Sequence, residues 1–364
     1  MNAYFAGAST LGSAGEMRGA LWHTRSATLR RSWANRLVRS MPNGLTRLAT
    51  FGLLVLLVPR SSFAQQHADS SHLDQSIDDA WWTGPMLAAS PNTLPHGHIL
   101  VEPYFFDVKT AHADGFGTLT YALVGVTDRL TMGSIITTGL NKPEVGTSSS
   151  GMGLGDLTLQ ATYRLTRFRK GSWVPITAVV FQQVLPTGKY DRLGNRPSDG
   201  LGSGAYTSSV AVYAQSYYWL PNHRILRMRL NLTQSFSPSV ELHDVSVYGT
   251  GEGFRGTAKP GPVFASGIAA EYSLTRSWVL ALDAQFNHYW NTRISGFDSF
   301  DPASTQDPPS TLLNSGSHHA FAFAPAIEYS WKPTIGVLFG TRFIPGNEHT
   351  TASISPAIAI NMVR

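Results

Sequence analysis

The sequence predicts an all-β protein: a transmembrane antiparallel up-and-down β-barrel of about 12 strands, after a cleaved signal peptide. Two observations support it. From residue 97 onward, strand-like segments alternate apolar and polar residues with a period of two, and short and long connections alternate along the chain. In addition, only 14% of the 364 residues are charged, against about 25% in an average globular domain. A low charged fraction suits a chain whose apolar side chains face lipid.

The alternation is clearest in residues 151–166. Asp156, Thr158, Gln160, Thr162 and Arg164 share one face, and the intervening residues Leu157, Leu159, Ala161, Tyr163 and Leu165 share the other. Because successive strand side chains point to opposite faces, one face meets hydrocarbon and the other meets water or polar groups. A soluble β-sandwich would show the same alternation, so this pattern alone leaves both architectures open.

Residues 1–64 form a predicted leader, with the signal peptide at 41–64. Arg47 supplies its positive charge, residues 48–58 are apolar, and Ser62 and Ala64 place small residues where signal peptidase cleaves, before Gln65. The apolar run is shorter than the roughly 18 residues of a spanning helix, which disfavours the alternative of a membrane anchor.

The charge balance argues against a nucleic-acid partner. The whole chain has 28 basic and 23 acidic residues, but residues 1–64 contain eight Arg and one Glu, which leaves 20 basic and 22 acidic residues in the mature part. A basic groove is therefore not indicated. The chain has no Cys, which excludes disulfides and Cys-ligated zinc, and we predict no cofactor.

Residues 65–96 are expected to form a periplasmic tether or to fold back as a plug, and the sequence does not decide between these. The barrel itself is predicted over 97–364. Its twelve strands are expected at about 97–109, 116–126, 129–138, 151–166, 173–185, 205–218, 223–235, 261–274, 277–290, 319–331, 334–343 and 350–363.

The connections favour the barrel over the sandwich. The long ones follow every second strand and are expected at 139–150, 186–204, 236–260 and 291–318. They therefore lie on one side, as the extracellular loops of a bacterial outer-membrane barrel do, opposite short periplasmic turns. An even strand count brings both ends of the barrel to the periplasm. We accordingly expect a Gram-negative envelope protein in the outer membrane.

Aromatic residues are enriched where the predicted strands end, which suggests two interfacial girdles. The residues are Trp81, Trp82, Trp173, Tyr217, Tyr218, Trp219, Tyr289, Trp290, Tyr329 and Trp331.

Three stretches resemble the outer-membrane β-barrel family named for the MetA pathway of phenol degradation. They are YALVGVTDRLTMG at 121–133, GLGDLTLQATY at 153–163 and FQQVLPTGK at 181–189. The resemblance covers roughly 97–362. It implies a transporter-like barrel that passes small, often aromatic or hydrophobic compounds, with no catalytic residues. One departure is the end of the chain at Val363-Arg364, where such barrels commonly end in an aromatic residue that the barrel assembly machinery reads.

The residue spacing disfavours three kinds of chemical site. Gly151, Gly153 and Gly155 lack the spacing and the helix of a nucleotide loop. His318 and His319 are adjacent in a strand and point apart, which does not suit one metal ion. An outer-membrane lipase needs a Ser and a His within reach, and no His-x-Ser occurs in the chain. We therefore predict that the protein is not an enzyme.

The charges that share the predicted lumen face are the candidate site, where they would form a salt-bridge lattice or a polar constriction. They are Glu102, Asp156, Arg164, Arg227, Arg229, Asp283, Glu328 and Arg342. The favoured function is a passive channel for small, aromatic or hydrophobic compounds, with outer-membrane lipid, small-molecule solutes and the assembly machinery as partners. The alternative is a structural or surface-interaction barrel with a closed lumen.

Overall fold

The computed structural model describes residues 74–298 and 310–364. The predicted leader and residues 65–73 lie outside the described residues. The described part is all-β, and no helix in it is long and apolar enough to cross a membrane.

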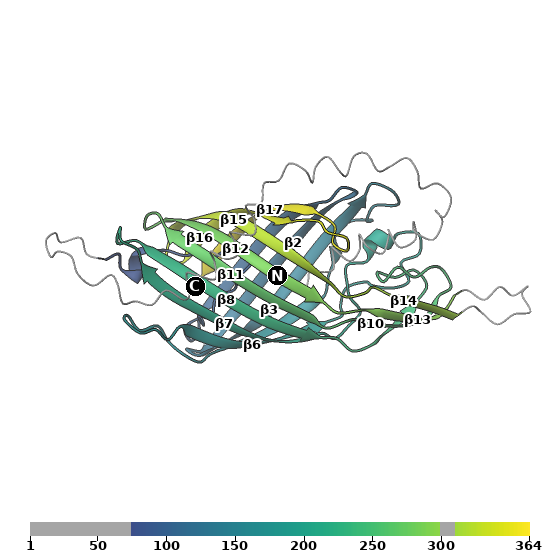
Figure 1. Cartoon of the computed structure of the whole chain (residues 1–364), viewed down its shortest axis with the longest axis horizontal. Coiled ribbons are helices and arrows are strands. Elements are labelled where there is room, and N and C mark those ends of the chain that lie inside the picture. Colours follow the sequence, from purple (N-terminus) through teal and green to yellow (C-terminus); the bar gives the residue numbers. More distant parts are fainter. Residues whose placement is uncertain (1–73, 299–309) are drawn as a thin grey trace, which may run out of the picture. The chain divides into compact units, whose positions relative to one another are not determined.

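Twelve strands form a closed antiparallel barrel, as predicted (Figure 1). Each strand pairs with its sequence neighbours in the wall, and β1 pairs with β17 to close the ring, with Leu100 opposite Val363. The strands are β1 (Ile99–Lys109), β2 (Ala113–Thr127), β3 (Leu130–Pro143), β5 (Leu157–Arg164), β6 (Ile176–Leu185), β7 (Ser208–Trp219), β8 (Ile225–Phe236), β11 (Val263–Ser273), β12 (Trp278–Tyr289), β15 (His318–Lys332), β16 (Ile335–Ile344) and β17 (Ser353–Val363).

Outward side chains are apolar and exposed, and inward ones are small or polar. In β12, Trp278, Leu280 and Leu282 are exposed, whereas Val279 and Asp283 are buried. An exposed apolar band around a closed barrel is the surface that meets lipid. The protein is therefore an outer-membrane β-barrel.

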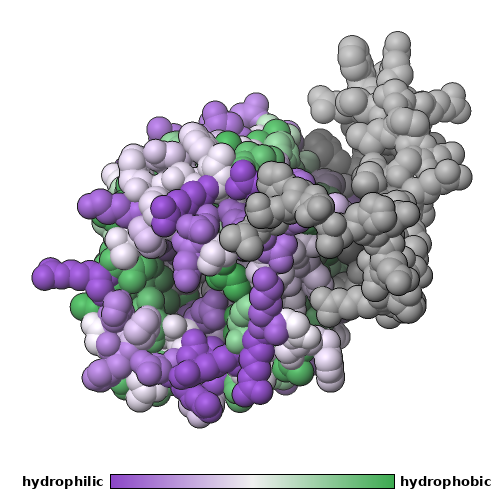
Figure 2. All heavy atoms as spheres, turned by 90° about the vertical axis from the view of Figure 1, so that its left-hand side faces the viewer, coloured by the Kyte–Doolittle hydropathy of each residue, from purple (hydrophilic) through white to green (hydrophobic). Residues whose placement is uncertain are grey.

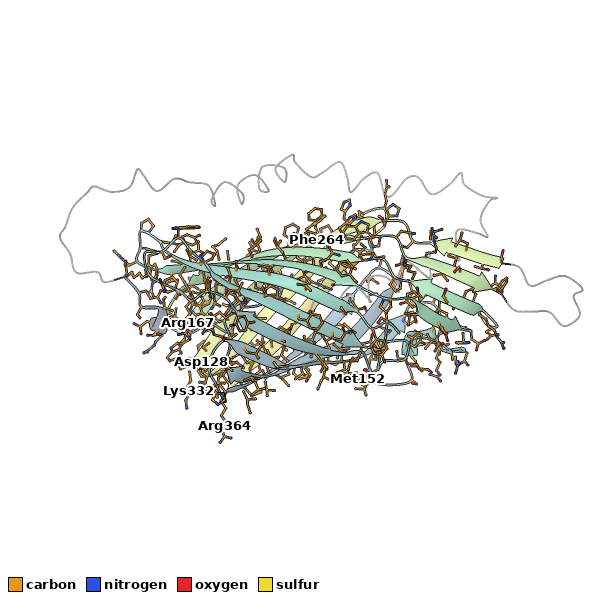
Figure 3. All side chains as sticks on the ribbon, turned by 90° about the horizontal axis from the view of Figure 1, so that it is seen from below. Asp128, Met152, Arg167, Phe264, Lys332 and Arg364 are labelled. Atoms are coloured by element: carbon orange, nitrogen blue, oxygen red, sulfur yellow. The ribbon has the colours of Figure 1, made fainter. Side chains whose placement is uncertain are left out.

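The two ends of the barrel differ as the loop lengths predicted. The turn end has short connections, such as 128–129 and 333–334, and the loop end has long ones, such as 186–207 and 237–262. Asp128, Arg167, Lys332 and Arg364 lie together at the turn end, and Met152 lies toward the loop end (Figure 3). Hydrophilic residues are spread over the turn end (Figure 2).

The loop end contains strands that the sequence analysis treated as loop. A second sheet combines β9 (Val240–His243), β10 (Arg255–Lys259), β13 (Arg293–Phe297) and β14 (Ser310–Asn314), in the order β14-β13-β10-β9. Its registers continue those of the wall: Val263 faces Tyr289 in the barrel, and Lys259 faces Arg293 in the extension. The hairpins thus project beyond the membrane band without changing register.

The predicted fourth strand is interrupted. It consists of the two-residue β4 (Gly153–Leu154) and of β5, with Gly155 and Asp156 in neither. Gly155 instead donates its N–H to the carbonyl of Thr137 at 2.9 Å. The alternation that begins at Asp156 did not reveal this break, because it starts after Gly155. The extra residue shifts the pairing with β3 by one, so the exposed apolar residues are even-numbered before the break, at Met152 and Leu154, and odd-numbered after it, at Leu159 and Tyr163.

The aromatic girdles are only partly as expected. Trp278, Trp331, Tyr218 and Trp290 are outward and exposed. In contrast, the indole N–H of Trp219 donates to the carbonyl of Gln75 at 2.8 Å, and the rings of Tyr217, Tyr289, Trp81 and Trp82 also lie on the inner side, where they contact lumen residues.

Candidate functional site: a segment across the lumen

Residues 81–96, which we call the lumen segment, enter and leave the barrel at its turn end. At the entry, Trp81 donates its N–H to the carbonyl of Arg276 at 2.9 Å, and the Arg276 guanidinium lies 4.7 Å from the Trp81 ring. At the exit, His96 donates its N–H to the Asp128 carboxylate at 3.1 Å. Since Arg276 and Asp128 both lie in short turns, the segment is a loop inserted from the periplasmic side.

The residues before the lumen segment are held at the same end. The Asp74 carboxylate contacts His223 at 3.2 Å and Lys170 at 3.3 Å. Hydrogen bonding from His223 and then from Lys170 lowers the pKa of Asp74 below its ordinary value. This exposed contact is therefore present at neutral pH.

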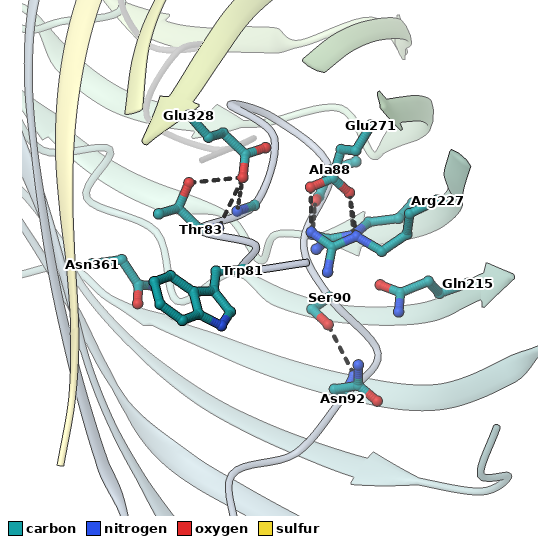
Figure 4. A network of polar contacts seen from close by, with 12 residues as sticks. Trp81, Thr83, Ala88, Ser90, Asn92, Gln215, Arg227, Glu271, Glu328 and Asn361 are labelled. Carbon is teal, nitrogen blue, oxygen red and sulfur yellow. Dashed lines mark hydrogen bonds and ion pairs between the residues drawn. The ribbon is translucent and has the colours of Figure 1, made fainter. Parts of the chain in front are cut away.

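Glu328 on β15 anchors the first part of the lumen segment (Figure 4). One of its carboxylate oxygens accepts hydrogen bonds from the Thr83 N–H and hydroxyl, both at 2.8 Å, and from the Gly84 N–H at 3.0 Å. Gly84 has a φ of +112°, which a residue with a side chain rarely adopts. This backbone turn aims consecutive N–H groups at one anion.

Three further wall residues, on β12 and β8, hold the centre of the lumen segment. Ala88 donates its N–H to the Asp283 carboxylate at 2.9 Å and accepts from the Arg229 guanidinium at 2.7 Å. Asn231 donates its side-chain N–H to the carbonyl of Ala89 at 3.2 Å. Side chains of the wall therefore bind both an N–H group and carbonyl groups of the segment backbone. Buried peptide groups need such partners.

Glu271 joins the two arginines. It accepts a two-pronged hydrogen bond from Arg227, whose Nε lies 2.7 Å away, and its carboxylate lies 3.2 Å from Arg229 Nε. The Arg227 guanidinium also stacks 4.3 Å from the Trp82 ring. The bidentate pairing with Glu271 and the cation–π contact with Trp82 hold the Arg227 side chain in one geometry.

Part of the lumen wall is apolar. Met86, in the lumen segment, is buried and packs in one cluster with inward side chains of six neighbouring strands, β15 to β17 and β1 to β3. These are Tyr104, Phe106, Leu119, Ile135, Ala324, Leu338, Ala357 and Ala359. The lumen segment thus contacts an apolar cluster as well as the charged side chains described above.

The structure brings four of the eight predicted site residues together. Arg227, Arg229, Asp283 and Glu328 are all buried and surround the lumen segment. Glu102 lies apart from them, 3.2 Å from the side-chain amide of Asn361, and Arg342 is buried on β16.

The two remaining predicted residues lie near opposite ends of the barrel. Arg164 donates to the carbonyl of Asp128 at 2.8 Å at the turn end. Asp156 at the loop end accepts from the N–H of Gly188 at 3.0 Å and from the N–H and hydroxyl of Ser203, both at 2.7 Å.

The sequence analysis missed Glu271 and the contacts of the lumen segment. Glu271 could have been found, because it shares the inward phase of Ala265 and Ala269 in β11. Thr83, Gly84, Met86 and Ala88 carry no periodic signal, since their positions are set by the wall and not by local pattern. Their insertion could not have been derived from the sequence.

The long loops contact one another at the loop end. The Tyr248 hydroxyl donates to the carbonyl of Ser203 at 2.6 Å, and burial raises the pKa of Tyr248 above its ordinary value. Asp199 accepts from the Ser150 N–H at 2.7 Å, and this bond is the main cause that lowers its pKa. Ala205, Leu242, Phe254 and other apolar residues form a small buried cluster beneath these contacts.

Comparison with known proteins fits this architecture. The family model described as "Putative MetA-pathway of phenol degradation" matches residues 85–347. The chain belongs to this phenol-degradation MetA-pathway family. The match begins within the lumen segment and ends in the last loop, so it spans most of the barrel. No curated protein matches the chain in sequence.

Two solved structures similar to this family member are a channel and a porin. The COG4313 outer membrane channel from Pseudomonas putida F1 has a TM-score of 0.54 and 14% sequence identity, and the match covers 77% of this chain and 100% of that one. The NanC porin has a TM-score of 0.41 and 10% identity, covering 72% and 98% of the two chains. Only the first exceeds a TM-score of 0.5, and it supports the fold.

Proposed function

We propose that this family member is a passive outer-membrane channel for small, aromatic or hydrophobic compounds, with residues 65–96 acting as its plug. The observation that carries the proposal is the apolar cluster in the lumen. Tyr104, Phe106 and their neighbours would give an apolar solute a favourable surface once the lumen segment moves away from it.

The proposed role of the predicted charges is to hold the lumen segment in place. Arg229, Asp283 and Glu328 bind backbone groups of the segment and no side chain of it except the Thr83 hydroxyl. Backbone contacts from one side of a loop can be released without unfolding the wall, because the ladder of the barrel does not pass through them. Selection would then come from the size and charge of the narrowed lumen.

The packing around Met86 favours the second candidate, a barrel whose lumen is closed. Met86 is only 1% exposed, and Glu271 and Glu328 are 0% exposed, so the lumen at this depth is filled in the described state. In that case the long loops would carry the function by binding partners at the cell surface. The two proposals differ in whether the segment leaves its position.

We also propose that the chain has no catalytic role and that the barrel assembly machinery inserts it into lipid. The similar COG4313 structure, an outer membrane channel, supports the first point. His288 on β12 packs edge-to-face on Trp290 at 4.5 Å between ring centres, which suits an interfacial aromatic pair and not a lipase base.

Single-channel recording of the purified mature chain in a planar bilayer tests the channel. We expect small, discrete openings that are interrupted when phenol is added, because phenol would bind at the apolar cluster of the lumen. A correctly folded barrel that never conducts would support the closed-lumen alternative.

A further inference from the structure

The connection between β5 and β6 differs from the short turns beside it at the periplasmic end of the barrel. It has eleven residues, 165–175, whereas the neighbouring β2–β3 turn has two, 128–129. Three of its residues are basic and none is acidic; the basic residues are Arg167, Arg169 and Lys170. We call residues 165–175 the basic loop.

Contacts with the barrel hold the basic loop in a defined shape. The Thr166 hydroxyl donates to the carbonyl of Pro175 at 2.6 Å, which joins the two ends of the loop. Between these ends the ring of Phe168 packs edge-to-face on the ring of Tyr217, with 5.0 Å between ring centres. Because Phe168 is the residue that packs on the barrel, the arginines on either side of it remain exposed.

Most of the positive charge of the basic loop has no partner in the protein. Lys170 contacts the Asp74 carboxylate at 3.3 Å. Arg167 and Arg169, in contrast, form no side-chain hydrogen bond or ion pair with any residue of 74–298 or 310–364. Two exposed guanidinium groups are therefore available to an anion from outside the chain.

The β2–β3 turn adds another cation beside the basic loop. Arg164, the last residue of β5, donates its N–H to the carbonyl of Arg129 at 2.9 Å. The exposed Arg129 side chain also has no partner among the residues that the structure describes. Arg129 and Arg167 lie close enough for their charges to act on Arg164, and Asp128, which lies with Arg167 at the turn end (Figure 3), offsets only one of these three charges. Like charges this close favour the binding of an anion.

Apolar side chains connect the basic loop to the lipid-facing band. Trp173 is 85% exposed, and Leu165, where the loop leaves β5, is 50% exposed. Tyr163, the last outward residue of β5, is also exposed. A Trp side chain in water is unfavourable, whereas at the headgroup level its ring meets acyl chains and its N–H meets polar groups. The exposure of Trp173 thus indicates that the basic loop lies at the surface of the bilayer.

We propose that the basic loop and Arg129 bind the phosphate groups of anionic phospholipids in the inner leaflet of the outer membrane. The inner leaflet is the one that the periplasmic end of the barrel meets, and anionic lipids attract clusters of Lys and Arg at a membrane surface. An acidic protein would satisfy the arginines but would not account for Trp173 and Leu165 beside the lipid-facing band. The proposal does not depend on whether the lumen conducts.

Removal of the three unpartnered cations tests the lipid site. The triple variant combines Arg129→Gln, Arg167→Gln and Arg169→Gln. Its matched control removes the same charge from exposed residues of the loop end whose side chains are in none of the described hydrogen bonds or ion pairs: Arg196→Gln, Arg255→Gln and Arg293→Gln. Native mass spectrometry measures binding of phosphatidylglycerol, phosphatidylcholine and glycerol phosphate to each purified mature chain in detergent micelles.

We expect the natural chain and the control to bind phosphatidylglycerol at least fivefold more tightly than phosphatidylcholine at low salt, and the triple variant to lose most of this preference. High salt should weaken the preference, because the contacts are exposed. Glycerol phosphate should not displace phosphatidylglycerol at equal concentration, since it lacks the acyl chains. A natural chain without the preference, a triple variant that keeps it, or displacement by glycerol phosphate would each overturn the proposal.

Fluorescence of Trp173 provides a second measurement if the triple variant does not fold. Bromine atoms on the acyl chains of a lipid quench a Trp that lies beside that lipid. The share of Trp173 is obtained as the difference between the natural chain and Trp173→Phe in lipid vesicles. We expect brominated phosphatidylglycerol to quench Trp173 more strongly than the same content of brominated phosphatidylcholine, and equal quenching would overturn the proposal.

Discussion

Glu328 is the residue on which the position of the lumen segment depends most. One carboxylate oxygen accepts three hydrogen bonds from Thr83 and Gly84, and hydrogen bonds to a charged group contribute roughly 1.5–3 kcal/mol each. In Glu328→Gln the acceptor loses its charge. We expect the amide hydrogens of Thr83 and Gly84 to exchange at least tenfold faster, measured by hydrogen exchange in detergent micelles.

The matched control for this substitution is Glu348→Gln, because Glu348 is exposed in the loop 345–352 and its side chain is in none of the described hydrogen bonds. It removes the same charge without touching the lumen segment. Equal protection of Thr83 and Gly84 in both variants would show that Glu328 does not hold the segment.

A substitution at Gly336 of β16 tests the contact between the wall and Thr83 of the lumen segment. A Cβ at this position would overlap the Thr83 methyl group, so Gly336→Ala must displace the lumen segment. We expect a lower free energy of unfolding by about 1–3 kcal/mol, the usual cost of overpacking, measured by denaturant titration in micelles.

Gly267→Ala in β11 serves as the control for Gly336→Ala, since the nearest atom to its Cβ would be the Ala284 carbonyl oxygen at an ordinary 3.8 Å. If the two alanine variants unfold at the same denaturant concentration, the segment does not press against Gly336 as the structure has it.

At the scale of elements, the contact between the β3–β4 connection and the β6–β7 loop depends on pH in a defined direction. The Ser150 N–H holds the pKa of Asp199 below its ordinary value near 3.8. A lowered pKa means that the contact stabilises the fold above the ordinary pKa and is lost as pH falls through the lowered one. We expect the Ser150 amide to stay protected from exchange at pH 5 to 8 and to lose protection only as the pH falls below the ordinary pKa of an aspartate, 3.8.

Asp199→Asn removes the titrating group and is the reference for this pH dependence. Its Ser150 amide should exchange at a rate that shows no acid-induced opening step. Loss of Ser150 protection already near pH 6 in the natural chain would contradict the assignment, because a carboxyl group with a lowered pKa is still ionised there.

The sequence predicts the elements of the wall well and their interruptions poorly. Strands such as β12 have a buried and an exposed face, so Leu282, Ala284 and Phe286 alternate with Asp283, Gln285 and Asn287 in a readable pattern. At Gly155 and Asp156 the exposed apolar face changes from even-numbered to odd-numbered residues, but Met152 and Leu154 alone are too few to define the earlier phase. β10 and β13 escaped prediction because they are short and rich in Gly, Ser and charged residues.

The lumen segment lies beyond what local patterns can predict. Its residue Met86 is buried by residues that are far away in sequence or on other elements, including Phe106 and Leu338. The stretch around it has the Pro, Gly and small residues of a tether, and its backbone bonds go to Glu328, Asp283 and Arg229 on distant strands. The period-two alternation of the strands placed those charged residues on the lumen face, but it did not indicate what they bind.

At the scale of the whole molecule, wall and lumen have separate roles. The wall is an antiparallel ladder that is continuous except beside β4, which pairs only with β3, and it does not depend on the lumen segment for closure. The segment is attached at the turn end by Trp81 and His96 and crosses to Met86 within the lumen. The central claim is that this segment narrows a channel that the wall alone would leave open.

Single-channel conductance of a segment-replacement variant tests that claim most directly. Residues 82–92 are replaced by a flexible Gly and Ser linker of equal length, so that the attachments at Trp81 and at 93–97 remain, and the variant is compared with the natural mature chain in the same planar bilayer. We predict a conductance at least severalfold higher, with longer openings. A folded variant that conducts no more than the natural chain would contradict the account.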